Sequence, residues 1–447
     1  MLFRSGDISR TTGAITSTGT VTLEGAGAQA VDFSGSTLAA LAVANTGTVT
    51  NAGSFSVSSF TKTLAGTFTL ALADTMSVSG SFIASAGTVT LTGPYAGGAA
   101  LFTVNGGTVA VGTSAFAAGA MSVSSGSFTQ TGANGGAQTA ASIAVSGTGS
   151  CVWDSGIAGG TLTVTGGTTL TAGTLNFNLK NVTIGTAVTG AVSFYDLLIP
   201  VGTTLTPGPS TTITVLRHLT IDNGGAYSAA NNPTLVLGTA AGAAGNITDS
   251  NGTPTNLGAV AVDTQARTMQ TAIATASLDI RNGGSLSTNA FALTVSGSVA
   301  TSAGAGALAA TGAEAITVGR DFTVTSFTQA SSTVILSNGT AGAASLGGGY
   351  TFNNLTINKA AAGDTVTLGG PMTVAASLTM TQGTLSAGAN PITLTSGNWD
   401  SSAVNFAFTQ GTSTVRLDAA SPTISQKAAD SFYNLTLQAG EIGRAHV

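Results

Sequence analysis

The stretch Met76–Phe82, which reads MSVSGSF, carries the pattern that decides the fold. Apolar and hydroxyl-bearing residues alternate on both sides of a glycine, and the phrase returns at Met121–Phe128 as MSVSSGSF. Successive side chains of a β-strand point to opposite faces, so the apolar residues can enter a core while the serines face water. Each copy therefore predicts a strand, a glycine corner and a second strand.

Short alternating runs of this kind continue along the chain. Examples are Thr20–Leu23 and Thr88–Leu91, which both read TVTL, and Leu293–Val295, which reads LTV. Threonine suits the outward positions because its branched Cβ favours extended backbone. Between the runs lie corners such as Asn223–Gly225 and Asn282–Gly284, where Asn and Gly tolerate the positive φ of tight turns. Helical patterns are nearly absent, so the sequence predicts an all-β protein without significant helix.

A longer repeat is clearest in the second half of the chain. The phrase FNNLTI at Phe352–Ile357 returns as FYNLTL at Phe432–Leu437, eighty positions later, and FYDLLI at Phe194–Ile199 lies close to two such periods upstream. Repeats at a fixed period are typical of solenoids and arrays. Eighty residues exceed one coil, so each block is interpreted as about four coils of roughly 20 residues.

These patterns predict an elongated parallel β-solenoid. We expect residues 6–190 to form short irregular coils and residues 191–440 to form the blocks of about 80 residues. With strands about 4.8 Å apart, roughly 22 coils would make a rod on the order of 100 Å long. Inward aliphatic side chains would stack into a continuous column, so stability would accumulate between neighbouring coils.

The repeated phrase also predicts which side chains form the core. Leu355 and Ile357 share one face of their strand, which we expect to be inward. Phe352 has the opposite parity, so a bend or bulge near Asn353–Asn354 must return its ring to the core. The predicted repeat core consists of Phe194, Leu197, Ile199, Phe352, Leu355, Ile357, Phe432, Leu435 and Leu437.

Composition excludes several classes of protein. Charged residues make up 6% of the chain and lysines and arginines form no cluster, which argues against nucleic acid, since that affinity depends on neutralised phosphates. Hydrophobic residues make up 43%, too many for a disordered chain. No run approaches the eighteen or so consecutive apolar residues of a membrane-spanning helix. The one cysteine, Cys151, leaves no internal disulfide.

Few residues are candidates for catalysis or metal binding. His218 would need partner residues, and the sequence places none beside it. Cys151 has no basic neighbour to lower its thiol pKa, so we expect a small core residue. The aspartates are spread singly, although stacked coils could still align two of them, as a polysaccharide-degrading enzyme requires. The sequence therefore predicts no catalytic residue, no cofactor and no metal site.

Two tryptophans are the candidate ligand contacts. Trp153 and Trp399 are each followed by an aspartate, Asp154 and Asp400, and the pairs could flank a sugar-binding groove. The alternative is that each indole packs under a loop or caps a corner of the solenoid. The first interpretation predicts that both side chains contact a glycan.

Both ends of the chain have the features of foreign sequence. Met1–Ser5 (MLFRS) and Glu441–Val447 (EIGRAHV) match translations of the two orientations of a common short-read sequencing adapter. We therefore expect residues 1–5 and 441–447 to be adapter-derived, and the chain between them to be an internal piece of a longer gene. Its partners would then include neighbouring repeats of the same longer chain.

The repeated phrases also carry a family resemblance. With its Phe-x-Asn-Leu-Thr phrases and the stretch GTLTVTGGT at Gly160–Thr168, the chain resembles the bacterial β-strand-repeat surface proteins, which include filamentous-haemagglutinin-like and autotransporter-passenger-like adhesins. The resemblance covers nearly all of residues 6–440. It implies a right-handed parallel β-helix, export, and an extracellular or cell-surface role in adhesion or surface architecture. No family active-site motif exists to be carried over.

We therefore expect a non-catalytic extracellular fragment that presents surface or acts as a stalk, with weak multivalent contacts to glycans or other cell surfaces. Neither nucleic acid nor a membrane span is expected. One alternative is a polysaccharide-degrading enzyme on the same scaffold. Another is an ice- or crystal-binding face of Thr-x-Thr ladders, such as Thr48–Thr50 and Thr212–Thr214. That face requires a strictly regular ladder, and the uneven coil spacing argues against one.

Overall fold

The structure, a computed structural model, describes most of the chain. The described residues are 1–3, 6–9, 12–98, 100–130, 138–153, 160–164, 168–170, 174–184, 187–189, 192–199, 201, 204–208, 211–238, 244–337 and 342–438. Of the two segments expected from the sequence to be adapter-derived, 1–5 and 441–447, residues 4–5 and 441–447 lie outside these ranges. The chain divides into two compact units: unit 1 is Met1–Val215 with Gly224–Pro233, and unit 2 is Leu216–Asn223 with Thr234–Val447.

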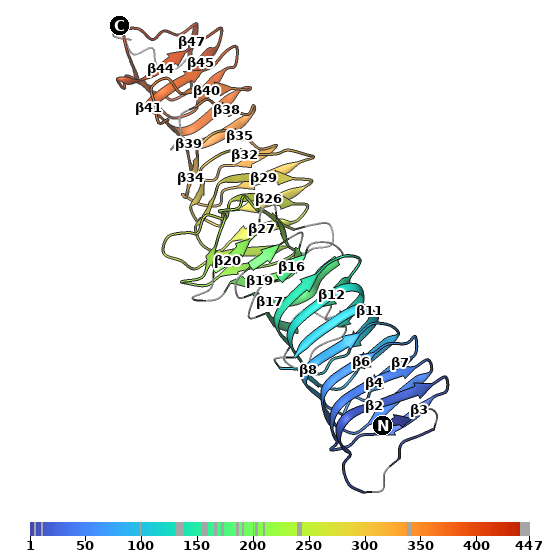
Figure 1. The fold of residues 1–447 in the computed structure, drawn as a ribbon. Helices are drawn as coiled ribbons and strands as arrows, with labels where there is room; N and C mark the ends of the chain where they lie inside the picture. Colours follow the sequence, from blue (N-terminus) through green and yellow to red (C-terminus); the bar gives the residue numbers. More distant parts are fainter. Residues whose placement is uncertain are drawn as a thin grey trace. The chain divides into compact units, whose positions relative to one another are not determined.

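Unit 1 is built of short strands joined by loops and turns (Figure 1). Its strands are β1 (Leu2–Phe3), β2 (Thr16–Gly25), β3 (Gln29–Asp32), β4 (Thr37–Asn45), β5 (Thr48–Ala52), β6 (Phe55–Lys62), β7 (Thr67–Leu70), β8 (Met76–Ala84), β9 (Thr88–Leu91), β10 (Tyr95–Ala96), β11 (Leu101–Val111), β12 (Phe116–Gln130), β13 (Gln138–Val145), β14 (Ser150–Trp153), β15 (Gly160–Val164), β16 (Thr168–Leu170), β17 (Thr174–Ile184), β18 (Ala187–Thr189), β19 (Val192–Ile199), β20 (Thr204–Pro207), β21 (Thr212–Val215) and β23 (Ala226–Tyr227).

Unit 2 has the same construction (Figure 1). Its strands are β22 (Leu219–Ile221), β24 (Thr234–Leu237), β25 (Gly245–Asp249), β26 (Ala259–Asp263), β27 (Ala266–Met269), β28 (Ile273–Thr275), β29 (Ser277–Arg281), β30 (Gly284–Ser287), β31 (Leu293–Val295), β32 (Val299–Ala300), β33 (Gly306–Ala309), β34 (Ala315–Val318), β35 (Phe322–Thr323), β36 (Ser326–Thr328), β37 (Thr333–Ser337), β38 (Ala344–Leu346), β39 (Tyr350–Asn358), β40 (Thr365–Leu368), β41 (Met372–Ser386), β42 (Ile392–Leu394), β43 (Trp399–Ser401), β44 (Asn405–Thr409), β45 (Thr414–Leu417), β46 (Ile424–Gln426) and β47 (Asn434–Leu437).

Strands of successive turns pair in parallel, so each turn stacks on the next. In unit 1, Val49 pairs with Phe68 of the following turn, and Phe68 pairs with Val89 of the turn after that. In unit 2, Leu355 pairs with Leu378 in the same way. The described residues contain no helix, and the strands stack as a parallel β-solenoid of about 18 turns. The predicted all-β solenoid is confirmed.

The number of turns is lower than the sequence predicted. Coils of about 20 residues would give roughly 22 turns, whereas the solenoid has about 18. Long loops account for the difference, because they add residues without adding a turn. Leu219 on β22, for example, pairs with Ile247 on β25, and the turn that joins them is longer than the predicted coil.

The predicted glycine corner of the phrase MSVSGSF is instead a bulge within one continuous strand, β8. In β8 the buried residues keep one parity on both sides of the exposed Gly80, with Met76 and Val78 before it and Phe82 and Ala84 after it. The partner strand β6 shifts its register at the same level, between Val57 and Ser59.

An apolar core fills the inside of unit 1, and stacked aromatic rings form part of it. The ring of Phe82 stacks on those of Phe60 and Phe102, with centroids 4.9 and 4.3 Å apart. Tyr95 meets the rings of Phe82 and Phe102 edge-on. All four side chains are at most 1% exposed. Burying a side chain such as Phe contributes roughly 1.5–3 kcal/mol, so stability accumulates from turn to turn.

The phrase FNNLTI lies in β39 and behaves as its parity predicts. The register of β39 against β41 shifts between Phe352 and Asn354, so the phenylalanine ring returns inward where the bulge was predicted. Phe352 is 0% exposed and packs near Phe322 and Tyr350, with centroids 5.8 Å away in both cases. The predicted core residues that the structure places inside are Phe194, Leu197, Ile199, Phe352, Leu355 and Ile357.

The third copy of the phrase does not lie in the core. Leu435 is 41% exposed, Leu437 is 40% exposed and Phe432 is half-buried. Leu435 and Leu437 lie on β47, which pairs with β45, and no other described strand covers the second side of β47; Phe432 precedes this strand. An inward column needs a turn on each side to close it, so the core prediction is wrong for Leu435 and Leu437, whereas the half-buried ring of Phe432 packs 5.2 Å from that of Trp399 between centroids.

Candidate functional site

A regular array of threonines covers one outward face of unit 1, on β5, β7 and β9. Each strand holds two threonines around one fully buried residue, which is Val49, Phe68 or Val89. Strand pairing places threonine opposite threonine at both positions. We call this array the threonine ladder, and its two columns are Thr48, Thr67 and Thr88, and Thr50, Thr69 and Thr90.

The ladder continues with small residues on β11 and β12. In the first column Thr108 pairs with Thr88, and Ser127 pairs with Thr108. The second column continues through Ala110 to Thr129. The hydroxyl of Ser127 donates a hydrogen bond to Oγ1 of Thr108 over 3.3 Å. Hydroxyl groups therefore occupy the first column on all five strands.

Glycines before the ladder strands bring neighbouring turns close together. A Cβ on Gly66 would lie 2.1 Å from the carbonyl oxygen of Gly47, and one on Gly87 would lie 2.3 Å from that of Gly66. A Cβ on Gly126 would lie 2.1 Å from the carbonyl oxygen of Gly107. Side chains do not fit between these turns, so backbone forms this edge of the ladder.

Uneven turn lengths do not disturb the ladder. The turn from Thr48 to Thr67 is shorter than the turn from Thr67 to Thr88, yet each threonine lies directly opposite the next. The variation lies in the loops, whereas strand pairing fixes the register. The sequence-based argument that uneven spacing excludes a regular ladder is therefore wrong for these strands. At the second predicted ladder, Thr214 on β21 lies opposite Ser193 instead of another threonine.

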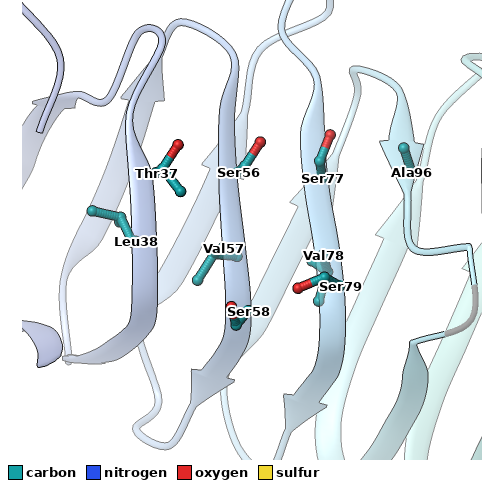
Figure 2. Close-up of a pocket in the computed structure, with 9 residues that line it drawn as sticks. All are labelled: Thr37, Leu38, Ser56, Val57, Ser58, Ser77, Val78, Ser79 and Ala96. Carbon is teal, nitrogen blue, oxygen red and sulfur yellow. The ribbon is translucent and has the colours of Figure 1, made fainter. Parts of the chain in front are cut away.

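A shallow groove on another face of the same turns is lined mainly by hydroxyl groups. Thr37, Ser56 and Ser77 are neighbours on β4, β6 and β8, and their hydroxyl groups lie on the same side of the strands (Figure 2). The groove has a volume of about 270 Å³. We call it the serine groove, and its lining is Thr37, Leu38, Ser56, Val57, Ser58, Ser77, Val78, Ser79 and Ala96.

Unit 2 has a wider hollow beside β41 and β43. Its volume is about 510 Å³, and its lining comes from residues 376–381, 396–398, 400, 402 and 403. The carboxylate of Asp400 accepts the hydroxyl of Ser402 at 2.6 Å and the backbone N–H of Ser402 at 3.0 Å. These two bonds hold the pKa of Asp400 below its ordinary value, so the hollow carries one ionised acceptor at neutral pH.

The two tryptophans predicted to contact glycans are buried. Trp153 is 0% exposed and packs against Phe128, with ring centroids 4.8 Å apart. Trp399 is 1% exposed and packs against Phe408, with centroids 4.7 Å apart. Stacking on a sugar needs an exposed aromatic face, so the predicted glycan contacts are wrong and both indoles are core residues. Asp154 lies outside the described residues.

Cys151 packs in the core, and His218 links two successive turns. Burial raises the pKa of the Cys151 thiol to about 12, so the thiol stays protonated. Nδ1 of His218 accepts a hydrogen bond of 3.1 Å from the backbone N–H of Asn246 in the next turn. Within the described residues, no three or more His, Cys, Asp or Glu side chains are grouped as metal ligands.

Two acids that the fold brings together in unit 2 pair with an arginine. Arg281 on β29 donates from Nε to Asp263 at 2.9 Å and from Nη1 to Asp279 at 3.4 Å. Asp263 also accepts the side-chain amide of Asn282, and Asp279 accepts the hydroxyl of Ser302. The bonds of Asp263 to Arg281 and Asn282, and that of Asp279 to Ser302, join successive turns, so both carboxylates act as acceptors that stabilise the stack.

No family model, no curated protein and no solved structure matches the chain. Within the described ranges no helix is long and apolar enough to cross a bilayer. The threonine ladder and the serine groove are the candidate surfaces, because each repeats one chemical group over several stacked turns.

Proposed function

We propose that the chain is a non-catalytic part of a bacterial extracellular or cell-surface protein, where it presents a repetitive surface and adheres through many weak contacts. The observation that carries this proposal is the separation of inward apolar from outward hydroxyl positions along the strands. In β6, Val57 and Phe60 are buried whereas Ser56 and Ser58 are exposed. The inside holds the turns together, and the outside is left for contact.

A stacked solenoid suits a surface that must extend and repeat. Each turn contacts its neighbours, so added turns lengthen the stack by about 4.8 Å each without requiring a larger core. The outward groups then recur at a constant spacing. Contacts that are weak singly become strong together when many engage at once. A low share of charged residues, 6%, leaves hydroxyl groups as the main polar chemistry of this surface.

The serine groove is the part of this surface that fits a glycan. Its hydroxyl groups both donate and accept hydrogen bonds, as sugar hydroxyls do. Leu38, Val57 and Val78 lie behind these groups and are at most 3% exposed, so the hydroxyl groups would make the contacts with a glycan. A shallow site of this size would bind each glycan weakly, so adhesion would depend on many copies.

Adhesion is tested with beads that carry many copies of the chain, on a glycan array and on cells. We expect binding that is lost in the double variant Ser56→Lys, Ser77→Lys, because two lysines would fill the serine groove. The double variant Thr67→Lys, Thr69→Lys on the threonine ladder is the matched control and keeps binding. Failure of the parent beads to bind any glycan or cell, or full binding by the groove variant, contradicts the proposal.

A further inference from the structure

We propose that the threonine ladder of unit 1 binds ice, a function that goes beyond the adhesive role proposed above. The ladder is an in-register array of threonine pairs on β5, β7 and β9, extended by Thr108 and Ser127. The spacing of the threonines identifies the ligand. An array of one chemical group at constant intervals matches a ligand surface whose own groups repeat at a constant interval.

The spacing of the ladder is close to that of water molecules in ice. Paired strands lie about 4.7–4.9 Å apart, which sets the distance between threonines of one column. Tetrahedrally bonded water with O···O distances of about 2.75 Å places second-neighbour oxygens about 4.5 Å apart. The mismatch is about 0.2–0.4 Å per turn, so it stays below about 1 Å across the three ladder strands.

The ladder is rigid before it meets a ligand. Threonine is branched at Cβ and has few side-chain rotamers on a strand. The buried residues between the threonines, Val49, Phe68 and Val89, anchor each strand in the core. The glycines at the edge hold the turns at close range. A surface that is already ordered loses little conformational entropy on binding, which a weak lattice contact requires.

The chemistry of the ladder also suits ice. Each threonine presents a methyl group and a hydroxyl group, so ordered water can be held by hydrogen bonds beside apolar surface. The ladder strands read TVTNA, TFTL and TVTL, without a charged residue. Charged groups would impose hydration shells of their own geometry on the surface. Because the ladder strands carry no charged group, water molecules beside them can adopt the arrangement of the ice lattice.

The neighbouring face of the same turns serves as an internal comparison. Its outward pairs are mixed: Ala40 and Ala42, Ser59 and Thr61, Ser81 and Ile83, and Leu101 and Thr103. The solenoid accepts this mixture, so the fold does not require threonine at outward positions. The successive threonine pairs on β5, β7 and β9 therefore indicate a ligand that contacts several of these pairs at once.

Ice binding is measured by partition of the full chain into slowly growing ice and by thermal hysteresis. We expect the parent chain to enrich in the ice fraction and to show thermal hysteresis. The ladder variant Thr67→Lys, Thr69→Lys should lose both, because two long charged side chains project from the central strand. The groove variant Ser56→Lys, Ser77→Lys carries the same number of lysines on adjacent turns and should keep both.

The outcomes separate this inference from the adhesive role. Exclusion of the parent chain from ice, or full activity in the ladder variant, overturns ice binding and leaves glycan adhesion unaffected. An unchanged circular dichroism melting curve shows that the ladder variant is folded. Its loss of activity then results from the changed surface and not from unfolding. If that variant does not fold, the variant Thr88→Lys, Thr90→Lys changes the next strand and decides in its place.

Discussion

Replacing Phe82 with alanine removes the ring at the centre of the aromatic stack in unit 1. The ring lies 4.9 Å from that of Phe60, 4.3 Å from that of Phe102 and 5.6 Å from that of Tyr95, measured between centroids. Phe→Ala in a packed core costs about 3–5 kcal/mol, and paired rings add to the loss. With aromatic neighbours in three directions, we expect a cost near the upper end, about 4–5 kcal/mol.

The cost should be local, because each turn contacts its neighbours and little else. Hydrogen exchange of the native chain, read by mass spectrometry, reports the free energy of local opening. We expect that free energy to fall by about 4–5 kcal/mol for amides of β6, β8 and β11. Amides of β39 in unit 2 should change by less than about 0.5 kcal/mol.

The matched control is Ser77→Ala, an outward position on the same strand as Phe82. Surface substitutions of this kind usually change stability by less than about 0.5 kcal/mol. The reasoning is refuted if Ser77→Ala lowers protection as much as Phe82→Ala. It is also refuted if Phe82→Ala lowers protection equally in both units, because then the columns of neighbouring turns do not carry the stability.

Three further outcomes follow from single residues. Gly66→Ala should destabilise unit 1 by about 1–3 kcal/mol in denaturant unfolding, because the new Cβ would lie 2.1 Å from the carbonyl oxygen of Gly47. The control Gly27→Ala should change stability little, because no atom lies within 4 Å of its Cβ. Burial raises the pKa of Glu314, but hydrogen bonds from a threonine hydroxyl and backbone amides outweigh burial and hold that pKa below its ordinary value. The stability that this carboxylate contributes is present above pH 4.5 and is lost as pH falls through the lowered pKa, so Glu314→Gln should flatten the fall of Tm with acid; an unchanged slope contradicts this. Cys151, whose burial raises its thiol pKa to about 12, should react with iodoacetamide at pH 8 only after unfolding, and rapid alkylation of the native chain contradicts its place in the core.

Inward and outward positions could be predicted from the sequence because parity along a strand is a local property. Parity placed Leu355 and Ile357 inside, and it required the bulge that returns the ring of Phe352 to the core. The same rule would have placed Trp153 inside as well. It shares the strand parity of Cys151, which the sequence assigned to the core, and its burial agrees with the alternative interpretation in which the indole packs within the solenoid.

Properties that depend on neighbouring turns could not be predicted. Leu435 has the parity of a core residue, yet it is exposed because no described turn covers its strand. The register of the threonine ladder also depends on how many residues each loop absorbs. Thr67 pairs with Thr48 before it and with Thr88 after it, and these two partners lie at unequal separations along the chain, so a search at one fixed period finds only one of them.

Unit 2 contains a shorter version of the ladder, which sharpens the inference about unit 1. Outward residues Thr365 and Thr367 on β40 pair with Thr384 and Ser386 on β41, but the next strand, β44, places alanine in the first column. The unit 2 array therefore has one complete threonine pair, against three successive pairs in unit 1. Lattice binding needs several matched groups at once, because each contact is weak. Loss of ice binding in the Thr67→Lys, Thr69→Lys variant with unit 2 intact would show that the number of successive pairs, and not the presence of outward threonine, decides the function.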